Sequence, residues 1–424
     1  MQTVLEQHGA QPVRTKLGLL WVSLPLKSLL MHTCNAAPTE TPNENMNKQN
    51  IHRQPDDAPF RENPTESYTL PARYYLDDAI HAMELDAIFY RQWWYAGHVS
   101  QLGKEGDFLT ACIGDQNVLV TRDKDAQLRA FYNVCQHRGH ELVSGTGNTK
   151  VLVCPYHAWS YALNGELKRA RNSERVANFN KCDFALKPVR VEVFCGMVFI
   201  NLDNDANSLA SLVPELEREI REFCPTVDDL QYVARDEYRV ECNWKVMIDN
   251  FLECYHCAPA HRDFVDLVDM KSYRSSVKGI YSSHVSKAAR STTNNAYTFE
   301  VGDVDFGYAG WYLWPNLTIW AYPGEANLSI LQMNPEGANK TIEYQDWFVP
   351  DGKITDQLRQ TIDYQKVVLQ PEDIGLCESV QRGLKSRGYN QGRFVVDEDL
   401  SELSEHAVHH FQSMVANALG AKLS

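Results

Sequence analysis

Two short clusters of cysteine and histidine hold the residues best suited to metal chemistry. Cys135 and His137 form a C-x-H pair, and Cys154 and His157 form a C-x-x-H pair after sixteen intervening residues. Thiolates and neutral imidazoles are both strong ligands for transition metals. Four of them in two short segments therefore predict one metal centre.

This ligand set fits two kinds of centre. In a Rieske [2Fe–2S] cluster the cysteines hold one iron and the histidines hold the other, which places the potential at roughly −150 to +300 mV. A structural Cys₂His₂ zinc site draws on the same ligand types. The neighbouring residues favour iron. Gly139 lets backbone N–H groups approach the cluster sulfurs, and Trp159 supplies an apolar cover. Hydrogen bonding and burial of this kind tune a redox metal.

A second candidate metal site combines His256, His261 and Asp373. On an uninterrupted helix the two histidines would point about 140° apart. Pro259 is expected to end the helix, so that His261 swings back toward His256. Asp373 follows Pro371, which is expected to start another helix. Two imidazoles and one carboxylate form the facial triad of non-haem Fe(II) oxygenases.

A plainer interpretation of this second set is a hydrogen-bonded histidine pair and an acidic first turn that complements a helix dipole. The first metal centre favours the iron interpretation, because a one-electron carrier needs a terminal acceptor. Glu253 lies three residues before His256 on a predicted helix over 243–257. Its carboxylate could bond His256 and bridge to the electron donor, or it could be only a surface charge. Asn250, one turn earlier, is expected behind the iron ligands.

Hydrophobic periodicity places these residues in an α+β fold, with an all-β module inserted in a mixed domain. Four expected strands near the cysteines and histidines put the ligands at strand ends. The expected helices cover residues 77–90, 209–224, 243–257 and 356–385; the expected strands cover 108–113, 117–121, 150–153 and 196–200, with more from 308 to 349. The expected domains are an extension that is disordered or mis-annotated (1–66), a helical segment (67–93), the cluster domain (94–204) and the catalytic domain (205–424).

Composition excludes some classes of function. The chain has 424 residues and a net charge of −14, and no basic stripe suggests a nucleic-acid partner. This charge favours a cationic small molecule or a basic partner protein. The eleven cysteines are scattered, which predicts free thiols in a reducing cytoplasm. Cys254 and Cys257 could form a C-x-x-C redox pair, although His256 between them has a use in the metal site.

The N-terminal region mimics a secretory signal. An apolar run over 17–26 follows Arg14 and Lys16, but it is too short to span a bilayer and Pro25 interrupts it. Residues 37–64 are polar and proline-rich, which is typical of a disordered tail. We expect translation to start at Met46, with a targeting segment as the alternative. No membrane association is expected.

From about Tyr68 onward, the chain resembles the α-subunits of Rieske-type non-haem iron oxygenases. The stretches 243–261 and 371–389, together with His406, are similar to the carnitine monooxygenase and betaine demethylase branch. This resemblance implies a helix-grip (START-like) catalytic domain with one [2Fe–2S] cluster and one mononuclear Fe(II) per subunit. It also implies a head-to-tail homotrimer in which His157 of one subunit contacts Glu253 of the next. A separate reductase with flavin and a ferredoxin centre would bring electrons from NAD(P)H.

The expected activity is therefore that of a terminal oxygenase that uses O₂ to hydroxylate a C–H bond beside a quaternary nitrogen. N-demethylation or C–N cleavage would follow, with carnitine, γ-butyrobetaine, glycine betaine and proline betaine as candidate substrates. Trp311, Trp320 and Tyr322 could hold the ammonium group by cation–π attraction, or they could pack the core. Two alternatives stay open: an oxygenase of the same architecture acting on an aromatic substrate, and a Rieske electron carrier without oxygenase activity.

Overall fold

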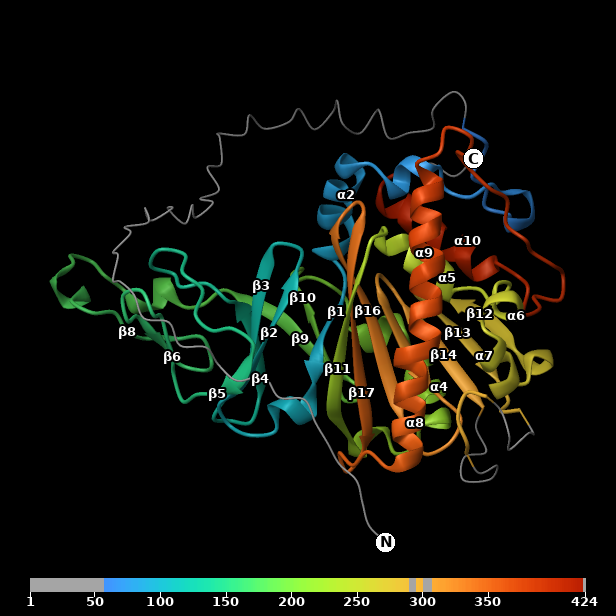
Figure 1. The fold of residues 1–424 in the computed structure, drawn as a ribbon. Helices are drawn as coiled ribbons and strands as arrows, with labels where there is room; N and C mark the ends of the chain where they lie inside the picture. Colours follow the sequence, from blue (N-terminus) through green and yellow to red (C-terminus); the bar gives the residue numbers. More distant parts are fainter. Residues whose placement is uncertain (1–56, 290–294, 300–306, 422–424) are drawn as a thin grey trace, which may run out of the picture. The chain divides into compact units, whose positions relative to one another are not determined.

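The computed structural model describes residues 57–289, 295–299 and 307–421. Two seven-stranded antiparallel sheets and one three-stranded sheet form its framework (Figure 1). The first large sheet has the order β1-β10-β9-β4-β3-β2-β5, and the small sheet has the order β6-β7-β8. Their strands are β1 (Trp94–His98), β2 (Asp107–Ile113), β3 (Gln116–Arg122), β4 (Leu128–Tyr132), β5 (Thr146–Asn148), β6 (Leu152–Val153), β7 (Ser160–Tyr161), β8 (Leu167–Arg169), β9 (Pro188–Phe194) and β10 (Met197–Asn201).

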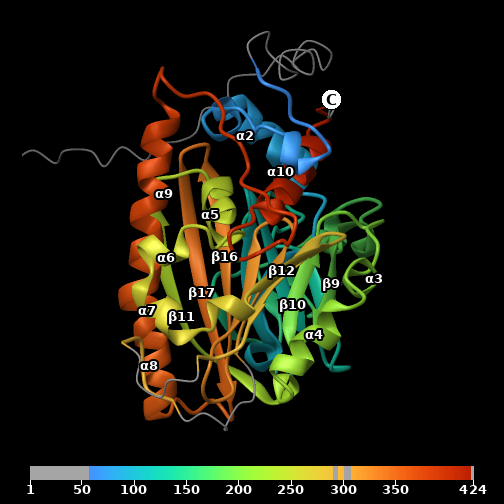
Figure 2. The same cartoon turned by 90° about the vertical axis from the view of Figure 1, so that its right-hand side faces the viewer.

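The second large sheet has the order β11-β17-β16-β15-β14-β13-β12. Its strands are β11 (Leu230–Val240), β12 (Arg274–Lys278), β13 (Tyr281–Ser286), β14 (Tyr308–Leu313), β15 (Leu317–Ala321), β16 (Leu328–Gly337) and β17 (Lys340–Pro350). Its helices are α5 (Trp244–Phe251), α6 (Cys257–Ala260), α7 (Arg262–Leu267), α8 (Asp356–Tyr364) and α9 (Gln370–Leu384). Figure 2 shows α6 and α7 beside α8 and α9, in front of this sheet.

Most predicted elements are present, and the four strands expected near the cluster ligands are β2, β3, β6 and β10. Two predicted helices are broken. The helix expected over 209–224 is split into α3 (Leu209–Leu212) and α4 (Leu216–Phe223), because Pro214 has no N–H to donate. The helix expected over 243–257 ends at Phe251 and resumes as α6, so Glu253 and His256 lie in a turn and not on one helical face.

A long helical segment runs from α8 through the π-helix η9 (Gln365–Leu369) into α9 (Figure 1). Pro371 lies in the first turn of α9, as the sequence predicts, although η9 leads into α9 without a break. A π-helical turn already interrupts the usual i→i−4 ladder, so a residue without an N–H fits there. This turn stands just before Asp373.

The predicted disordered extension through residue 66 is wrong for its last ten residues. Asp57 is buried and forms an ion pair with Arg73 at 2.6 Å, and the N–H of Tyr68 donates to the carbonyl of Pro59. The expectations for the apolar run at 17–26 and for Met46 lie outside the described residues. Within the described ranges, no helix is both long and apolar enough to cross a bilayer.

One buried ion pair joins the N-terminal helix α2 (Asp78–Glu84) to α5. Glu84 accepts hydrogen bonds from the Lys245 ammonium and, at 2.9 Å, from the Trp244 indole. The side chains of Glu84 and Lys245 are both fully buried. Removing one partner would leave an uncompensated charge in the core beneath the helix that leads to the candidate iron site.

Glu84→Gln should therefore lower the free energy of unfolding by about 3–5 kcal/mol. The thermal unfolding midpoint, followed by circular dichroism, would measure this loss. Glu237→Gln is the matched control, because the Glu237–Arg239 pair is exposed and is worth less than about 1 kcal/mol. Equal midpoints in the two variants would show that the buried pair does not stabilise the fold.

Candidate metal centres

Two loops of the cluster domain bring the cysteine and histidine pairs together. Cys135 and His137 follow β4, and Cys154 and His157 lie between β6 and β7. Each cysteine is only 2% exposed, whereas His137 is exposed and its ring centroid lies 4.5 Å from that of His157. The thiols thus face the protein interior and the imidazoles face outward. This polarity puts the histidine side of a bound cluster at the surface.

Neighbouring side chains fix these ligands. The Tyr161 hydroxyl accepts the N–H of Gln136 at 3.0 Å and lies 3.3 Å from Cys135 Sγ, so its own proton can be donated to the sulfur. Burial raises the pKa of Tyr161, which keeps the hydroxyl protonated. Trp159 stacks on His137 with 4.7 Å between the ring centroids. Trp159 was expected as an apolar cover, but Tyr161 was not predicted from the sequence.

The four ligands form a thiol pair and an imidazole pair. The buried thiols of Cys135 and Cys154 interact with each other, and the imidazole rings of His137 and His157 are neighbours nearer the surface. A two-iron cluster, with the thiol pair on one iron and the imidazole pair on the other, fits this arrangement.

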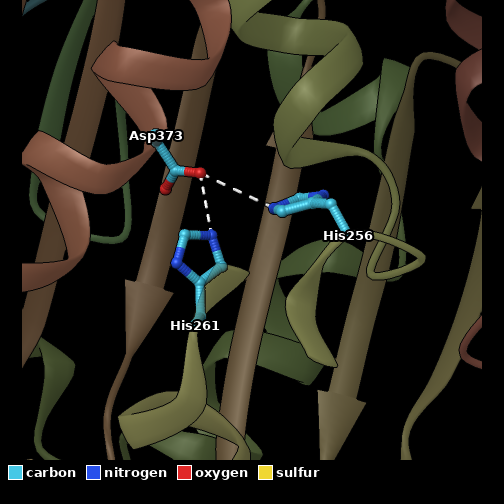
Figure 3. A group of neighbouring side chains, drawn as sticks. All are labelled: His256, His261 and Asp373. Carbon is cyan, nitrogen blue, oxygen red and sulfur yellow. Dashed lines mark hydrogen bonds and ion pairs between the residues drawn. The ribbon is translucent and has the colours of Figure 1, made fainter. Parts of the chain in front are cut away.

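The second candidate site is compact (Figure 3). One Asp373 oxygen lies 2.9 Å from His261 Nε2 and 3.6 Å from His256 Nε2. The two imidazole rings are nearly perpendicular, with 5.0 Å between their centroids. A slight approach of the three side chains would bring one donor atom of each to bonding distance from a single ion. The residues thus fit the mononuclear iron that the sequence predicted.

Burial and hydrogen bonding shift the pKa values of these side chains. Burial would raise the pKa of Asp373, but hydrogen bonds with His256 and His261 lower it to about 2. Burial would lower the pKa of His256, but its bonds to Asp373 and Glu253 raise it to about 10. The anionic carboxylate thus holds protons on the imidazoles in the absence of another cation. A metal ion takes the place of those protons.

Two further side chains orient the histidines. Glu372 contacts His261 Nδ1 at 2.8 Å, and this arrangement of carboxylate, histidine and metal is common behind metal ligands. Glu253 contacts His256 Nδ1 at 2.5 Å and accepts the backbone N–H of His256 at 3.1 Å. The amide of Asn250 lies 3.5 Å from His256 Nε2, beside the ligand atom and not behind the ring as expected. Glu372 was not predicted from the sequence, which singled out only its neighbour Asp373 as a partner of His261.

A disulfide joins Cys254 to Cys257 and closes the turn that carries Glu253 and His256. Both cysteines are buried. The sequence analysis treated a Cys254–Cys257 pair and a metal ligand at His256 as competing interpretations. The structure accommodates both in one turn. The other cysteines of the described ranges are free.

A cavity opens beside the three candidate iron ligands, and aromatic side chains form much of its wall. Its lining includes Phe251, Phe264, Tyr273, Tyr308 and Trp320, and none of the described residues in the lining is a lysine or arginine. Trp320 was predicted from the sequence. Tyr322 stacks against Trp320 at 5.7 Å and donates to Gln365, so it supports the wall without lining the cavity.

Trp311 does not belong to this cavity. Its indole donates to Glu219 at 3.2 Å and its ring packs on Phe223, in the core on the other face of the sheet. Strand β14 alternates its side chains, so Tyr308 faces the cavity and Trp311 faces away from it. The predicted substrate contact of Trp311 is therefore withdrawn.

Comparisons with known proteins agree with this geometry. Residues 92–180 match the Rieske [2Fe-2S] domain, and residues 227–421 match the ring hydroxylating alpha subunit (catalytic domain). The chain is 40% identical to the oxygenase subunit of carnitine monooxygenase from Escherichia coli K12, over 84% of this chain and 95% of that protein. It is 31% identical to the chloroplastic choline monooxygenase of Arabidopsis thaliana, with 83% of each covered.

A solved structure of a quaternary ammonium Rieske monooxygenase, described for carnitine oxidation and inter-subunit electron transfer, superposes with a TM-score of 0.80 at 35% identity. It covers 87% of this chain and 99% of its own. The predicted fold, an all-β Rieske domain inserted in a helix-grip catalytic domain, is thereby confirmed. The chain belongs to the Rieske-type, ring-hydroxylating oxygenase α-subunit family.

Proposed function

We propose that the protein is a terminal oxygenase that uses O₂ and reductase-delivered electrons to oxidise a quaternary ammonium compound. The observation that carries this proposal is the aromatic cavity beside His256, His261 and Asp373, whose wall has no lysine or arginine among the residues that the structure describes. Aromatic faces attract a trimethylammonium group with about 0.5–2 kcal/mol per contact. The carboxylates of Glu253 and Asp373 in the lining add negative potential that favours a cation. Two relatives act on carnitine and choline, and both of these substrates carry a quaternary ammonium group.

In the proposed mechanism, mononuclear iron held by His256, His261 and Asp373 supplies the activation of O₂ when it is bound. The chain's own residues bind and orient the substrate. Trp320 and Phe251, whose rings lie 5.0 Å apart, place an N-methyl or N-methylene C–H bond near the ligands. The buried aromatic wall also keeps water from the reacting bond. N-demethylation and C–N cleavage both begin with this C–H hydroxylation.

We further propose that electrons cross between subunits of a homotrimer. Within one chain, the cluster loops near β6 lie at one end, and α5, α6 and α9 lie with the second large sheet toward the other end, with the first large sheet between them (Figure 1). Glu253 and His256 line the substrate cavity and also a second cavity of about 330 Å³ on the other side. Glu253 is therefore placed to link His256 to the partner's His157.

Exposed apolar side chains occur at both surfaces that would meet in this trimer. Tyr156 beside His157 is 54% exposed and Val153 is 47% exposed. Val380 and Tyr389, which line the second cavity, are 49% and 44% exposed. Contact between the two surfaces would remove this apolar area from water.

The remaining partners follow from the same activity. A reductase with flavin and a ferredoxin-type centre would pass electrons from NAD(P)H to the outward-facing histidines of the cluster. One [2Fe–2S] cluster and one mononuclear iron per subunit would meet the electron demand. We place the protein in the cytoplasm, where NAD(P)H is available and where the six described cysteines that neither bind the cluster nor form the disulfide stay reduced.

Purified protein with a reductase and NADH should consume O₂ only when a quaternary amine is present. A panel of L-carnitine, γ-butyrobetaine, glycine betaine, proline betaine and choline, with naphthalene as the aromatic control, would identify the substrate class. Mass spectrometry for formaldehyde and trimethylamine separates N-demethylation from C–N cleavage. Turnover of naphthalene alone would favour an aromatic hydroxylase, and cluster reduction without any O₂ uptake would favour an electron carrier.

Asp373→Ala should remove the mononuclear iron and all turnover while leaving the visible spectrum of the cluster intact. Iron content should fall from about three to about two per chain, as measured by plasma emission spectrometry. Asp363→Ala, an exposed position on α8 of the same helical segment, is the matched control and should keep all three irons. Loss of the cluster spectrum in folded Asp373→Ala protein would contradict two separate sites.

Glu253→Gln should keep both iron centres and the trimer but lower turnover by about 10- to 100-fold, the usual effect of losing a carboxylate behind a metal ligand. Glu253→Asp should retain part of the activity. The control is Glu222→Gln on α4, where the carboxylate is exposed. Stopped-flow absorbance would follow reoxidation of the reduced cluster. Reoxidation at the rate of the native protein would remove Glu253 from the electron path.

A further inference from the structure

A buried histidine outside the metal sites contacts a tyrosine of the substrate cavity. His284 on β13 is fully buried, and its Nδ1 lies 3.1 Å from the hydroxyl of Tyr273. Its Nε2 lies 3.0 Å from the hydroxyl of Ser282, which is also fully buried. Burial lowers the pKa of His284 to about 3, so the ring is neutral and has one donor and one acceptor.

The direction of the two hydrogen bonds follows from the need to satisfy buried groups. Among the described residues, the only partner of the Ser282 hydroxyl is Nε2 of His284. If this hydroxyl did not donate to Nε2, its proton would stay buried and unsatisfied, which costs about 1–3 kcal/mol. Nε2 is therefore the acceptor, and Nδ1 carries the proton and donates it to the Tyr273 oxygen. The proton of the Tyr273 hydroxyl is then left for another acceptor.

An acceptor for the proton of the Tyr273 hydroxyl can lie inside the cavity. Tyr273 lines the cavity, and its pKa is raised well above the usual value by burial, so the hydroxyl stays protonated. Tyr308 stacks beside it with 6.5 Å between the ring centroids. Within the described part of the chain, the lining offers no lysine or arginine to bind an anionic group. The hydroxyl of Tyr273 is the donor that is already oriented by the protein.

We infer that Tyr273, oriented by His284, donates a hydrogen bond to a carboxylate on the substrate. This inference rests on the proposed function and narrows its substrate class to zwitterions that carry both a quaternary ammonium and a carboxylate. The aromatic wall holds the cationic end and Tyr273 receives the anionic end. His284 is a positioning residue, because it acts only through Tyr273.

The test compares two ligands that differ only at the anionic end. γ-Butyrobetaine carries a carboxylate where the butyltrimethylammonium ion carries a methyl group. Calorimetry on the oxidised holoenzyme, without reductase, measures the binding of each without turnover. Tyr273→Phe should weaken γ-butyrobetaine by about 10- to 100-fold and leave butyltrimethylammonium within about twofold, since only a hydrogen bond to a charged acceptor is lost.

Matched variants separate this role from a structural one. Tyr238→Phe removes a hydroxyl that bonds Gln345 on the second large sheet and lines neither cavity, so it should change the binding of neither ligand. His284→Leu should lose the preference for γ-butyrobetaine, and His284→Asn, whose amide N–H replaces Nδ1–H, should recover most of it. In turnover assays, Tyr273→Phe should raise KM for γ-butyrobetaine while kcat stays within about twofold.

Equal weakening of both ligands by Tyr273→Phe, or no change in either, would overturn the inference while leaving the proposed function in place. Failure of His284→Asn to recover the preference that His284→Leu loses would remove His284 from the positioning role. If the native protein binds no quaternary amine, the proposed function fails, and the inference that rests on it fails as well.

Discussion

A single carboxylate shared by two imidazoles sets the architecture of the catalytic domain. Asp373 comes from α9, whereas His256 and His261 come from the turns around α6, more than a hundred residues earlier. Every element between these points must fold so that one oxygen lies near two Nε2 atoms. The π-helical turn before α9, the short helix α6 and the turn after Phe251 all serve this requirement. Uninterrupted α-helices would point the side chains of His256, His261 and Asp373 away from one another.

The Rieske domain places its four ligands so that only one side of the metal centre faces outward. Its cysteines are buried and its histidines face outward, so a bound cluster would exchange electrons at one side only. That side lies far from the same chain's candidate iron site (Figure 1). The distance explains why we propose a head-to-tail assembly. In this assembly Glu253, which touches His256 and lines an outward cavity, becomes the point of contact.

The sequence predicted those features of the fold and the sites that depend on residues close together in the chain. Cys135, His137, Cys154 and His157 lie in short loops, and the apolar runs beside them predicted the neighbouring strands. The partners Tyr161 and Glu372 could not be found this way, because they reach their targets only in the folded chain. The prediction that Trp311 contacts the substrate was also wrong. Both faces of β14 are buried, so its sequence does not alternate and gives no sign of which side chains face the cavity.

We propose that the cluster of one subunit serves the iron site of another. Oligomers assembled from two inactive variants test it most directly: Cys135→Ser, which lacks the cluster, and Asp373→Ala, which lacks the mononuclear iron. With different affinity tags, mixed oligomers can be purified and assayed for O₂-dependent oxidation of γ-butyrobetaine. Electron transfer between subunits predicts that the mixed oligomers recover activity although neither parent has any. Purified mixed oligomers that contain both centres and stay inactive would contradict the account.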